Sequence, residues 1–126
     1  TILIAEDNAI NTKVVRLQLK RLGYDSDHGN DGVEAVEMMD AKVEKDGVPY
    51  NLVLMDLQMP RKDGFEATIE IKGKYGDRTR VVALSANVYN EEKNRCKEIG
   101  MSGFLNKPLL PEALAVQLQE AYKQYH

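Results

Sequence analysis

The stretch NLVLMDLQMP, residues 51–60, decides how this chain folds. Its apolar run, residues 52–55, has the length and composition of a strand buried on both faces. The run ends on the carboxylate of Asp56, and Pro60 follows four residues later. An aspartate often begins the turn after a strand, so Asp56 is either a turn residue or a residue with a chemical task. The segments on either side discriminate between the two.

Short apolar runs alternate with amphipathic segments along the whole chain. The apolar runs predict strands at residues 2–5, 24–29, 52–55, 81–84 and 104–105. The amphipathic segments predict helices at residues 10–22, around 36–43, at 63–74 (broken by Gly73 and Gly76), at 91–99 and at 110–125. Five such units predict an α/β fold, a doubly wound five-stranded parallel sheet with helices on both faces. We expect the flavodoxin-like strand order 2-1-3-4-5, in which ligands bind beside strands 1 and 3.

Length and composition restrict the classes of protein. A chain of 126 residues with a net charge of −3 forms one domain, residues 1–126, and offers no basic surface for nucleic acid. No apolar run approaches the ~20 residues of a membrane span, so we expect no membrane contact. The single cysteine, Cys96, fits a reducing, cytoplasmic compartment. Thr1 stands where a start methionine would, which suggests a domain cut from a longer protein.

Four of the five predicted strands end in a carboxylate, a hydroxyl or an ammonium group that could serve one site. In the predicted order these four strands are neighbours, and the polar HGND end of the second strand lies apart from them. One polar strand end means little, but a cluster at one sheet edge indicates a functional site. The cluster comprises Glu6 and Asp7 after the first strand, Asp56 after the third, Ser85 after the fourth and Lys107 after the fifth.

Three carboxylates at one edge indicate a metal site. Two carboxylates ~4 Å apart repel by ~4 kcal/mol at an effective dielectric constant of 20, so a third would force protonation unless a cation joins them. Hard oxygen ligands without Cys or His favour Mg²⁺, or Mn²⁺, over zinc. Mg²⁺ keeps coordination positions open for phosphate oxygens, and Lys107 and Ser85 suit a phosphoryl group. Alternatively, Glu6 and Asp7 cap the first helix, a role for which Asn8 competes.

The chemistry at this edge differs from nucleotide binding. The chain lacks the GxxxxGK[ST] motif of a phosphate-binding loop. A carboxylate can itself be the nucleophile and form an aspartyl phosphate. Asp56, which lies between the acids of the first strand and Ser85, is the candidate for that role.

Five stretches resemble the response-regulator receiver domain of two-component signalling, over essentially the whole chain: ILIAEDN, LVLMDLQMP, DGFEA, ALSAN and GFLNKP. The resemblance implies that Asp56 accepts a phosphoryl group from a histidine kinase or a histidine phosphotransfer domain. It further implies that Asp7 binds Mg²⁺ directly, Glu6 through water, and Gln58 through its backbone carbonyl. Ser85 and Lys107 would bind the phosphoryl oxygens. The residues of these motifs resemble those of receivers in hybrid sensor histidine kinases more than those of receivers fused to DNA-binding domains.

The resemblance also implies a switch and a reset. Phe104 occupies the position of the switch aromatic residue, although it is equally suited to plain core packing. Ser85 and Phe104 would move together and reshape the face of the fourth helix, fifth strand and fifth helix, which downstream effector or fused domains would read. Gln58 and Asn87 flank the phosphoryl position and are expected to tune its hydrolysis. The bond from Lys107 to Pro108 is expected to be cis.

Two other functions remain possible at this level. A pseudo-receiver would be a scaffold that has lost its site, against which the intact acids, Ser85 and Lys107 argue. A turnover enzyme such as an aspartyl-phosphate phosphatase of the haloacid dehalogenase type needs a second aspartate two residues after the nucleophile, where this chain has Gln58. We therefore expect a switch that catalyses only its own phosphorylation and dephosphorylation.

Overall fold

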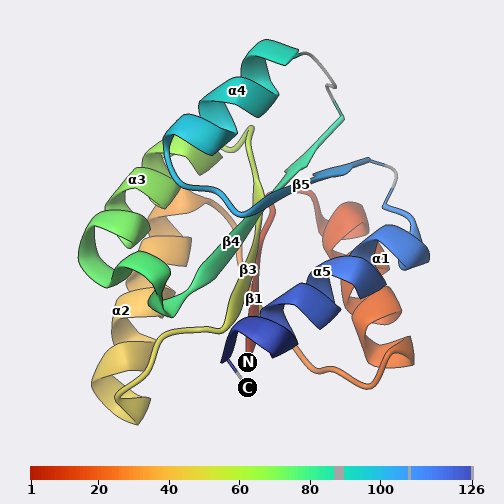
Figure 1. The fold of residues 1–126 in the computed structure, drawn as a ribbon, viewed down its shortest axis with the longest axis horizontal. Coiled ribbons are helices and arrows are strands. Elements are labelled where there is room, and N and C mark those ends of the chain that lie inside the picture. Colours follow the sequence, from red (N-terminus) through yellow and green to blue (C-terminus); the bar gives the residue numbers. More distant parts are fainter. Residues whose placement is uncertain (87–89, 108, 126) are drawn as a thin grey trace.

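The computed structural model describes residues 1–86, 90–107 and 109–125 as a sheet between two layers of helices (Figure 1). The strands are β1 (Ile2–Ala5), β2 (Asp27–Gly29), β3 (Leu52–Asp56), β4 (Arg80–Ser85) and β5 (Gly103–Asn106). The helices are α1 (Ala9–Arg21), α2 (Gly32–Asp46), α3 (Gly64–Tyr75), the 3-10 helix η1 (Gly76–Arg78), α4 (Asn90–Glu98) and α5 (Pro111–Tyr125).

The sheet has the predicted topology. Its order is β2-β1-β3-β4-β5, and every paired strand is parallel. Leu54, in the middle of β3, lies beside Ile4 of β1 and Val82 of β4. The prediction of a doubly wound five-stranded parallel sheet is confirmed. Because all strands run the same way, their carboxyl ends meet at one edge.

Alternation along the strands divides the core into two layers. Leu3, Val53 and Val81 pack with residues of α2 and α3 on one face of the sheet. Ile4 and Leu54 pack with residues of α1 and α5 on the other face. In Figure 1, α2, α3 and α4 accordingly lie on one side of the sheet, and α1 and α5 on the other. Every residue of β3 is buried, as expected for a central strand covered on both faces.

Two predicted elements differ from the structure. Strand β2 begins at Asp27 rather than at residue 24, because the chain is still leaving α1 there and Tyr24 is exposed. Helix α3 continues through Gly73, which was wrongly predicted to break it. A glycine in a helix interior costs only about 1 kcal/mol relative to alanine, so neighbouring packing can override it. The helix ends at Tyr75, and the residue that caps it, Gly76, has a φ of 55° that suits glycine.

Helix α1 presents an apolar stripe to solvent. Ile10, Val14 and Leu17 have the spacing of a buried face, yet they are 74%, 45% and 51% exposed. The residues that pack inward are Val15 and Leu19. The stripe is therefore a surface feature and does not form part of the core.

The loop after β3 is tied to the beginning of α2. Asp31 caps α2 by accepting a hydrogen bond from the Glu34 amide, at 2.9 Å. The other oxygen of the same carboxylate pairs with Arg61 Nε, at 2.6 Å. Arg61 has a positive φ of 63°, unusual for a residue with a side chain, and this ion pair helps to hold it there. Asp31 is 5% exposed, and the Arg61 guanidinium holds its pKa below the ordinary value.

We predict that Asp31→Asn destabilises the fold at neutral pH but not in acid. A lowered pKa means that the ionised group stabilises the fold above the unfolded pKa of about 3.9, and that this contribution is lost as the pH falls. Asparagine keeps the cap, whereas Asp31→Ala removes the cap as well and costs about 1 kcal/mol more. Urea unfolding at pH 7 and at pH 3 measures both variants. An equal deficit of Asp31→Asn at the two pH values would contradict the assignment.

Candidate functional site at the carboxyl edge of the sheet

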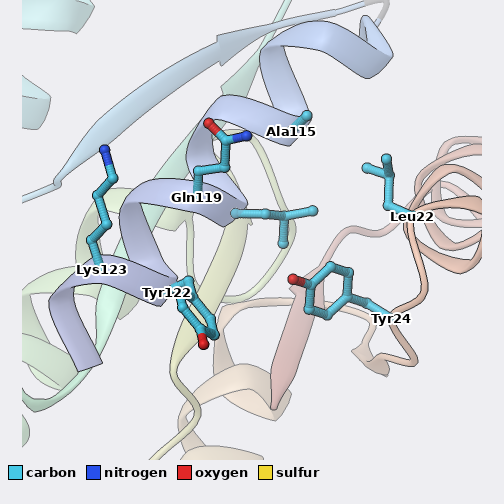
Figure 2. Close-up of a pocket in the computed structure, with 7 residues that line it drawn as sticks. Leu22, Tyr24, Ala115, Gln119, Tyr122 and Lys123 are labelled. Atoms are coloured by element: carbon cyan, nitrogen blue, oxygen red, sulfur yellow. The ribbon is translucent and has the colours of Figure 1, made fainter. Parts of the chain in front are cut away.

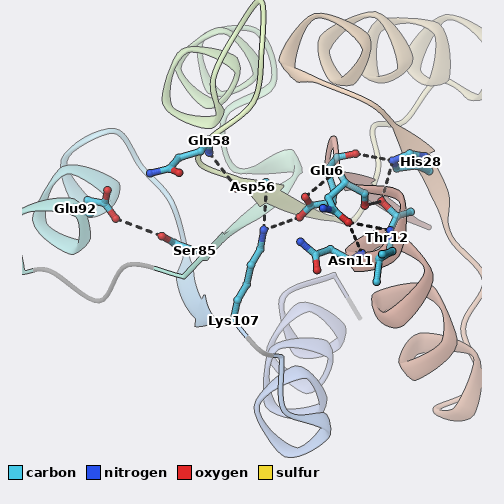
Figure 3. A network of polar contacts seen from close by, with 11 residues as sticks. Glu6, Asn11, Thr12, His28, Asp56, Gln58, Ser85, Glu92 and Lys107 are labelled. Atoms are coloured by element: carbon cyan, nitrogen blue, oxygen red, sulfur yellow. Dashed lines mark hydrogen bonds and ion pairs between the residues drawn. The ribbon is translucent and has the colours of Figure 1, made fainter.

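The carboxyl ends of β1, β3 and β5 bring three acids and one ammonium group together. Ligand oxygens of Glu6, Asp7 and Asp56 all lie within 4.8 Å of one another. Lys107 Nζ lies 2.8 Å from Glu6 Oε2 and 2.9 Å from Asp56 Oδ2 (Figure 3). The prediction that these side chains meet at one edge is confirmed. Glu6 and Asp56 are 1% and 5% exposed, whereas Asp7 faces solvent.

Local interactions fix the orientation of the acids. Asn8, not Glu6 or Asp7, caps α1, because its side chain accepts from the amides of Ile10 and Asn11. The alternative reading of the two acids as caps is therefore wrong. Asp56 Oδ1 accepts a hydrogen bond from the backbone amide of Gln58 at 3.0 Å, which leaves Oδ2 for Lys107.

The imidazole of His28 fixes the end of β1. Its Nε2 donates to the backbone carbonyl of Glu6, at 2.7 Å (Figure 3). His28 lies on β2 beside Ile4 of β1, so this contact crosses between neighbouring strands. It positions the backbone immediately before Asp7 without placing an imidazole among the acids.

Gly64 allows α3 to begin against the end of β3. A Cβ at this position would lie 2.2 Å from the backbone oxygen of Asp56, far inside van der Waals contact. The preceding residue, Asp63, caps α3 by accepting from the Glu66 amide at 2.8 Å. The stretch DGFEA thus joins a helix cap to a residue that must lack a side chain.

We predict that Gly64→Ala displaces the end of β3 and destabilises the fold. The clash is with backbone, which cannot move aside like a flexible side chain. Gly73→Ala is the control, because a Cβ at residue 73 meets nothing within 4 Å and alanine favours the helix. We expect Gly64→Ala to melt lower than wild type and Gly73→Ala to melt at or above it. Thermal unfolding measures this, and equal melting temperatures would contradict it.

Burial and pairing set the charges of the cluster. Burial raises the pKa of Glu6 above its ordinary value, against the opposing effect of Lys107. Burial alone would lower the pKa of Lys107, but its hydrogen bonds to Glu6 and Asp56 raise it above the ordinary value. Lys107 therefore stays charged and offsets one of the three acids. The remaining negative charge favours a cation.

The donor set fits a hard divalent cation. Each of the three acids offers one carboxylate oxygen, and an acid-rich site without His or Cys favours Mg²⁺ or Mn²⁺. Asp7 and Gln58 also line an open depression of about 520 Å³ beside Asp56, which leaves room for water or a phosphoryl group. Glu92 and Arg95 of α4 line its other side.

The remaining predicted site residues lie around this cluster. Ser85 ends β4 and is 3% exposed, and its hydroxyl donates to Glu92 Oε2 at 3.3 Å. Phe104 of β5 is half-buried, packs against the core under α2 and α3, and has Lys93 Nζ 5.5 Å from its ring centroid. Two predictions, the role of Asn87 and a cis bond before Pro108, lie outside the described residues. The sequence pattern indicates Glu92 only as an acid at the start of a helix, and its position seven residues after Ser85 does not by itself predict their contact.

A second depression, of about 310 Å³, lies between the end of α1 and α5 (Figure 2). It is lined by Leu22, Tyr24, Ala115, Leu118, Gln119, Tyr122 and Lys123. These described residues include no acid, histidine or cysteine, so they offer neither a hard-metal site nor an acid nucleophile. This depression therefore lacks the carboxylate ligands that the acid cluster offers.

A strand order, an acid cluster and a strand-end lysine in this arrangement are shared with a known family. The family model described as the response regulator receiver domain matches residues 2–119. The chain belongs to this family. It is a receiver domain of two-component signalling.

Relatives of this receiver domain are histidine kinases. Histidine protein kinase 1 of Candida albicans is 44% identical over 90% of this chain, and hybrid signal transduction histidine kinase F of Dictyostelium discoideum is 41% identical over 98%. The receiver domain spans only 5% and 11% of the lengths of these two proteins. The matched region in such hybrid kinases is their receiver domain.

Solved structures agree with this assignment. The receiver domain of a sensor histidine kinase from Pseudomonas aeruginosa is 34% identical, with a TM-score of 0.82 over 94% of this chain and 93% of its own. That structure holds a magnesium ion in its active site cleft. A chemotaxis protein of Vibrio cholerae is 28% identical, with a TM-score of 0.80 over 95% and 96% of the two chains. No helix among the described parts of the receiver domain is long and apolar enough to cross a membrane.

Proposed function

We propose that this receiver domain is a phosphorylation switch that accepts a phosphoryl group onto Asp56 from a phosphohistidine. One observation carries the proposal: Asp56 ends the central strand as a buried carboxylate close to Glu6 and Asp7, with Lys107 Nζ 2.9 Å from its Oδ2. In the transfer, a carboxylate oxygen of Asp56 forms a bond to phosphorus as the bond from phosphorus to the imidazole nitrogen breaks. The imidazole leaves with the electron pair and takes up a proton.

Each neighbour of Asp56 has a role in this step. Glu6, Asp7, Asp56 and the backbone carbonyl of Gln58 would hold Mg²⁺, or Mn²⁺, which when bound neutralises charge on the phosphoryl oxygens. Lys107 stabilises negative charge on the transferred group, because it already lies at the acceptor oxygen. The hydrogen bond from the backbone amide of Gln58 keeps the Asp56 carboxylate from rotating.

The donor would be a histidine kinase or a histidine phosphotransfer domain. Two observations support this: the relatives are hybrid histidine kinases, and α1 presents an exposed apolar stripe. Val14 of that stripe lines a groove together with Lys107 of the site, so a docked helical domain would bring its histidine toward Asp56. A cytoplasmic location and fused or downstream effector domains belong to the same proposal, which includes no contact of this domain with nucleic acid or membrane.

The output and the reset complete the proposal. The Ser85 hydroxyl would turn to the phosphoryl oxygens, and Phe104 would move with it, which reshapes the face of α4, β5 and α5 by a population shift. Gln58 and Asn87 would tune the in-line attack of water that hydrolyses the aspartyl phosphate. Neither is a general base, so we propose slow hydrolysis rather than turnover.

Incubation with a small phosphodonor and Mg²⁺ tests the proposal. A persistent gain of about 80 Da, one phosphoryl group, is expected in the intact mass and should be absent when the metal is chelated. A domain that never gains mass would be a scaffold. Rapid, continuous release of phosphate without a persistent adduct would indicate a phosphatase.

A further inference from the structure

The proposed switch depends on the Ser85 hydroxyl, and the carboxylate of Glu92 accepts a hydrogen bond from it. Ser85 Oγ donates to Glu92 Oε2 at 3.3 Å, and this contact is partly buried. In Figure 3 the Ser85 hydroxyl points toward Glu92 on α4, away from Asp56. Glu92 belongs to the first part of α4, which begins at Asn90.

The next residue of α4 contacts the second proposed switch position. Lys93 Nζ lies 5.5 Å from the centroid of the Phe104 ring, within the range of a cation–π interaction. Consecutive residues of one helix therefore contact both Ser85 and Phe104. A displacement of α4 would act on the two positions together.

We propose that Glu92 is a positioning residue that holds the unphosphorylated state by retaining the Ser85 hydroxyl. The inference rests on the proposed function, because it assigns Glu92 a part in the same switch. A serine hydroxyl has one proton to donate, so it can serve the Glu92 carboxylate or a phosphoryl oxygen but not both fully. Phosphorylation must therefore break the contact between Ser85 and Glu92.

Charge adds to this competition. Glu92 lines the same depression as Asp7 and Gln58, the space that the phosphoryl group would enter. Its carboxylate repels a phosphoryl group while Ser85 is held, and hydrogen bonds to charged acceptors are stronger than those between neutral groups. Glu92 thus stabilises the unphosphorylated state selectively, and its loss should shift the population toward the phosphorylated-like state.

Binding of beryllofluoride, a phosphoryl analogue, in the presence of Mg²⁺ tests this proposal. We expect Glu92→Ala to bind the analogue about five-fold more tightly than wild type, as for one partly exposed hydrogen bond to a charged acceptor. Glu92→Gln, which retains a neutral acceptor, should fall between the two. Glu91→Ala is the matched control, because it removes the neighbouring exposed acid from the same helical turn.

A double-mutant cycle with Ser85→Ala identifies the partner. Without the hydroxyl, Glu92→Ala should have a clearly smaller effect, because only the charge repulsion between Glu92 and the analogue remains to be removed. If Glu92→Ala matches Glu91→Ala, or if its effect persists undiminished in Ser85→Ala, the inference is overturned.

Hydrogen exchange separates this inference from the proposed function. The amides of α4 should exchange faster in metal-free Glu92→Ala than in Glu91→Ala, a measurement that needs no phosphoryl chemistry. If wild type fails to bind beryllofluoride, the proposed function fails, and the contact between Ser85 and Glu92 is then tested by the exchange measurement alone. If wild type binds and neither affinity nor exchange responds to Glu92, only the inference fails.

Discussion

Asp56→Asn is expected to abolish formation of the phosphorylated receiver domain. An amide is a very poor nucleophile. Within the described acid cluster, Asp56 is the acid at the tip of the central strand, and Lys107 pairs with the carboxylate oxygen that does not bind the Gln58 backbone amide. The fold should survive, because the amide keeps its size and an amide oxygen can still accept from Gln58. Intact-mass analysis with a small phosphodonor and Mg²⁺ should show the gain of about 80 Da in wild type only.

Asp63→Asn is the matched control for this experiment. Asp63 lines the same open depression and caps α3, and asparagine caps a helix about as well as aspartate. The control variant should be phosphorylated at close to the wild-type yield. A full mass gain on Asp56→Asn would place the acceptor elsewhere, whereas a loss on both variants would point to the charge of the depression instead.

Asp7→Asn is expected to remove most of the stabilisation that Mg²⁺ provides. Asp7 is the solvent-facing member of the acid cluster, so it can reach a cation directly as the cation enters. A ligand that binds only the folded state stabilises it by about 2.7 kcal/mol at one hundred times its dissociation constant. The wild-type melting temperature should therefore rise with Mg²⁺, and that of the variant should stay nearly flat.

The same replacement should slightly stabilise the metal-free domain, because it removes like charge from beside Glu6 and Asp56. Asp25→Asn makes the same change of net charge on an exposed residue that lines a separate depression beside α1. This control should retain the full response to Mg²⁺. A wild-type-like response in Asp7→Asn would show that the metal binds elsewhere.

Local pattern was sufficient to predict the architecture. The apolar run of residues 52–55 predicted the buried β3, and alternation of strands and helices predicted the parallel sheet. The strand order then placed Glu6, Asp56 and Lys107 at one edge without any knowledge of their contacts. These predictions succeed because parallel strands fix the direction in which every strand ends.

Local pattern was less able to locate the ends of weak elements. The edge strand β2 is only Asp27–Gly29, and α3 continues through Gly73. In both cases propensity is a weak preference that the packing of neighbouring elements overrides.

By itself, then, the sequence determined the fold class, the strand order and the set of residues at the carboxyl edge. Only the tertiary structure decided which side of each element is covered: Ile10 and Leu17 share helical spacing with Val15 and Leu19, yet the first pair faces solvent. Only the tertiary structure also decided that Ser85 donates to Glu92. The physical reason is that periodicity specifies the directions of side chains along one element. Burial and hydrogen bonding depend on which other element lies in those directions. That element comes from a segment distant in the chain.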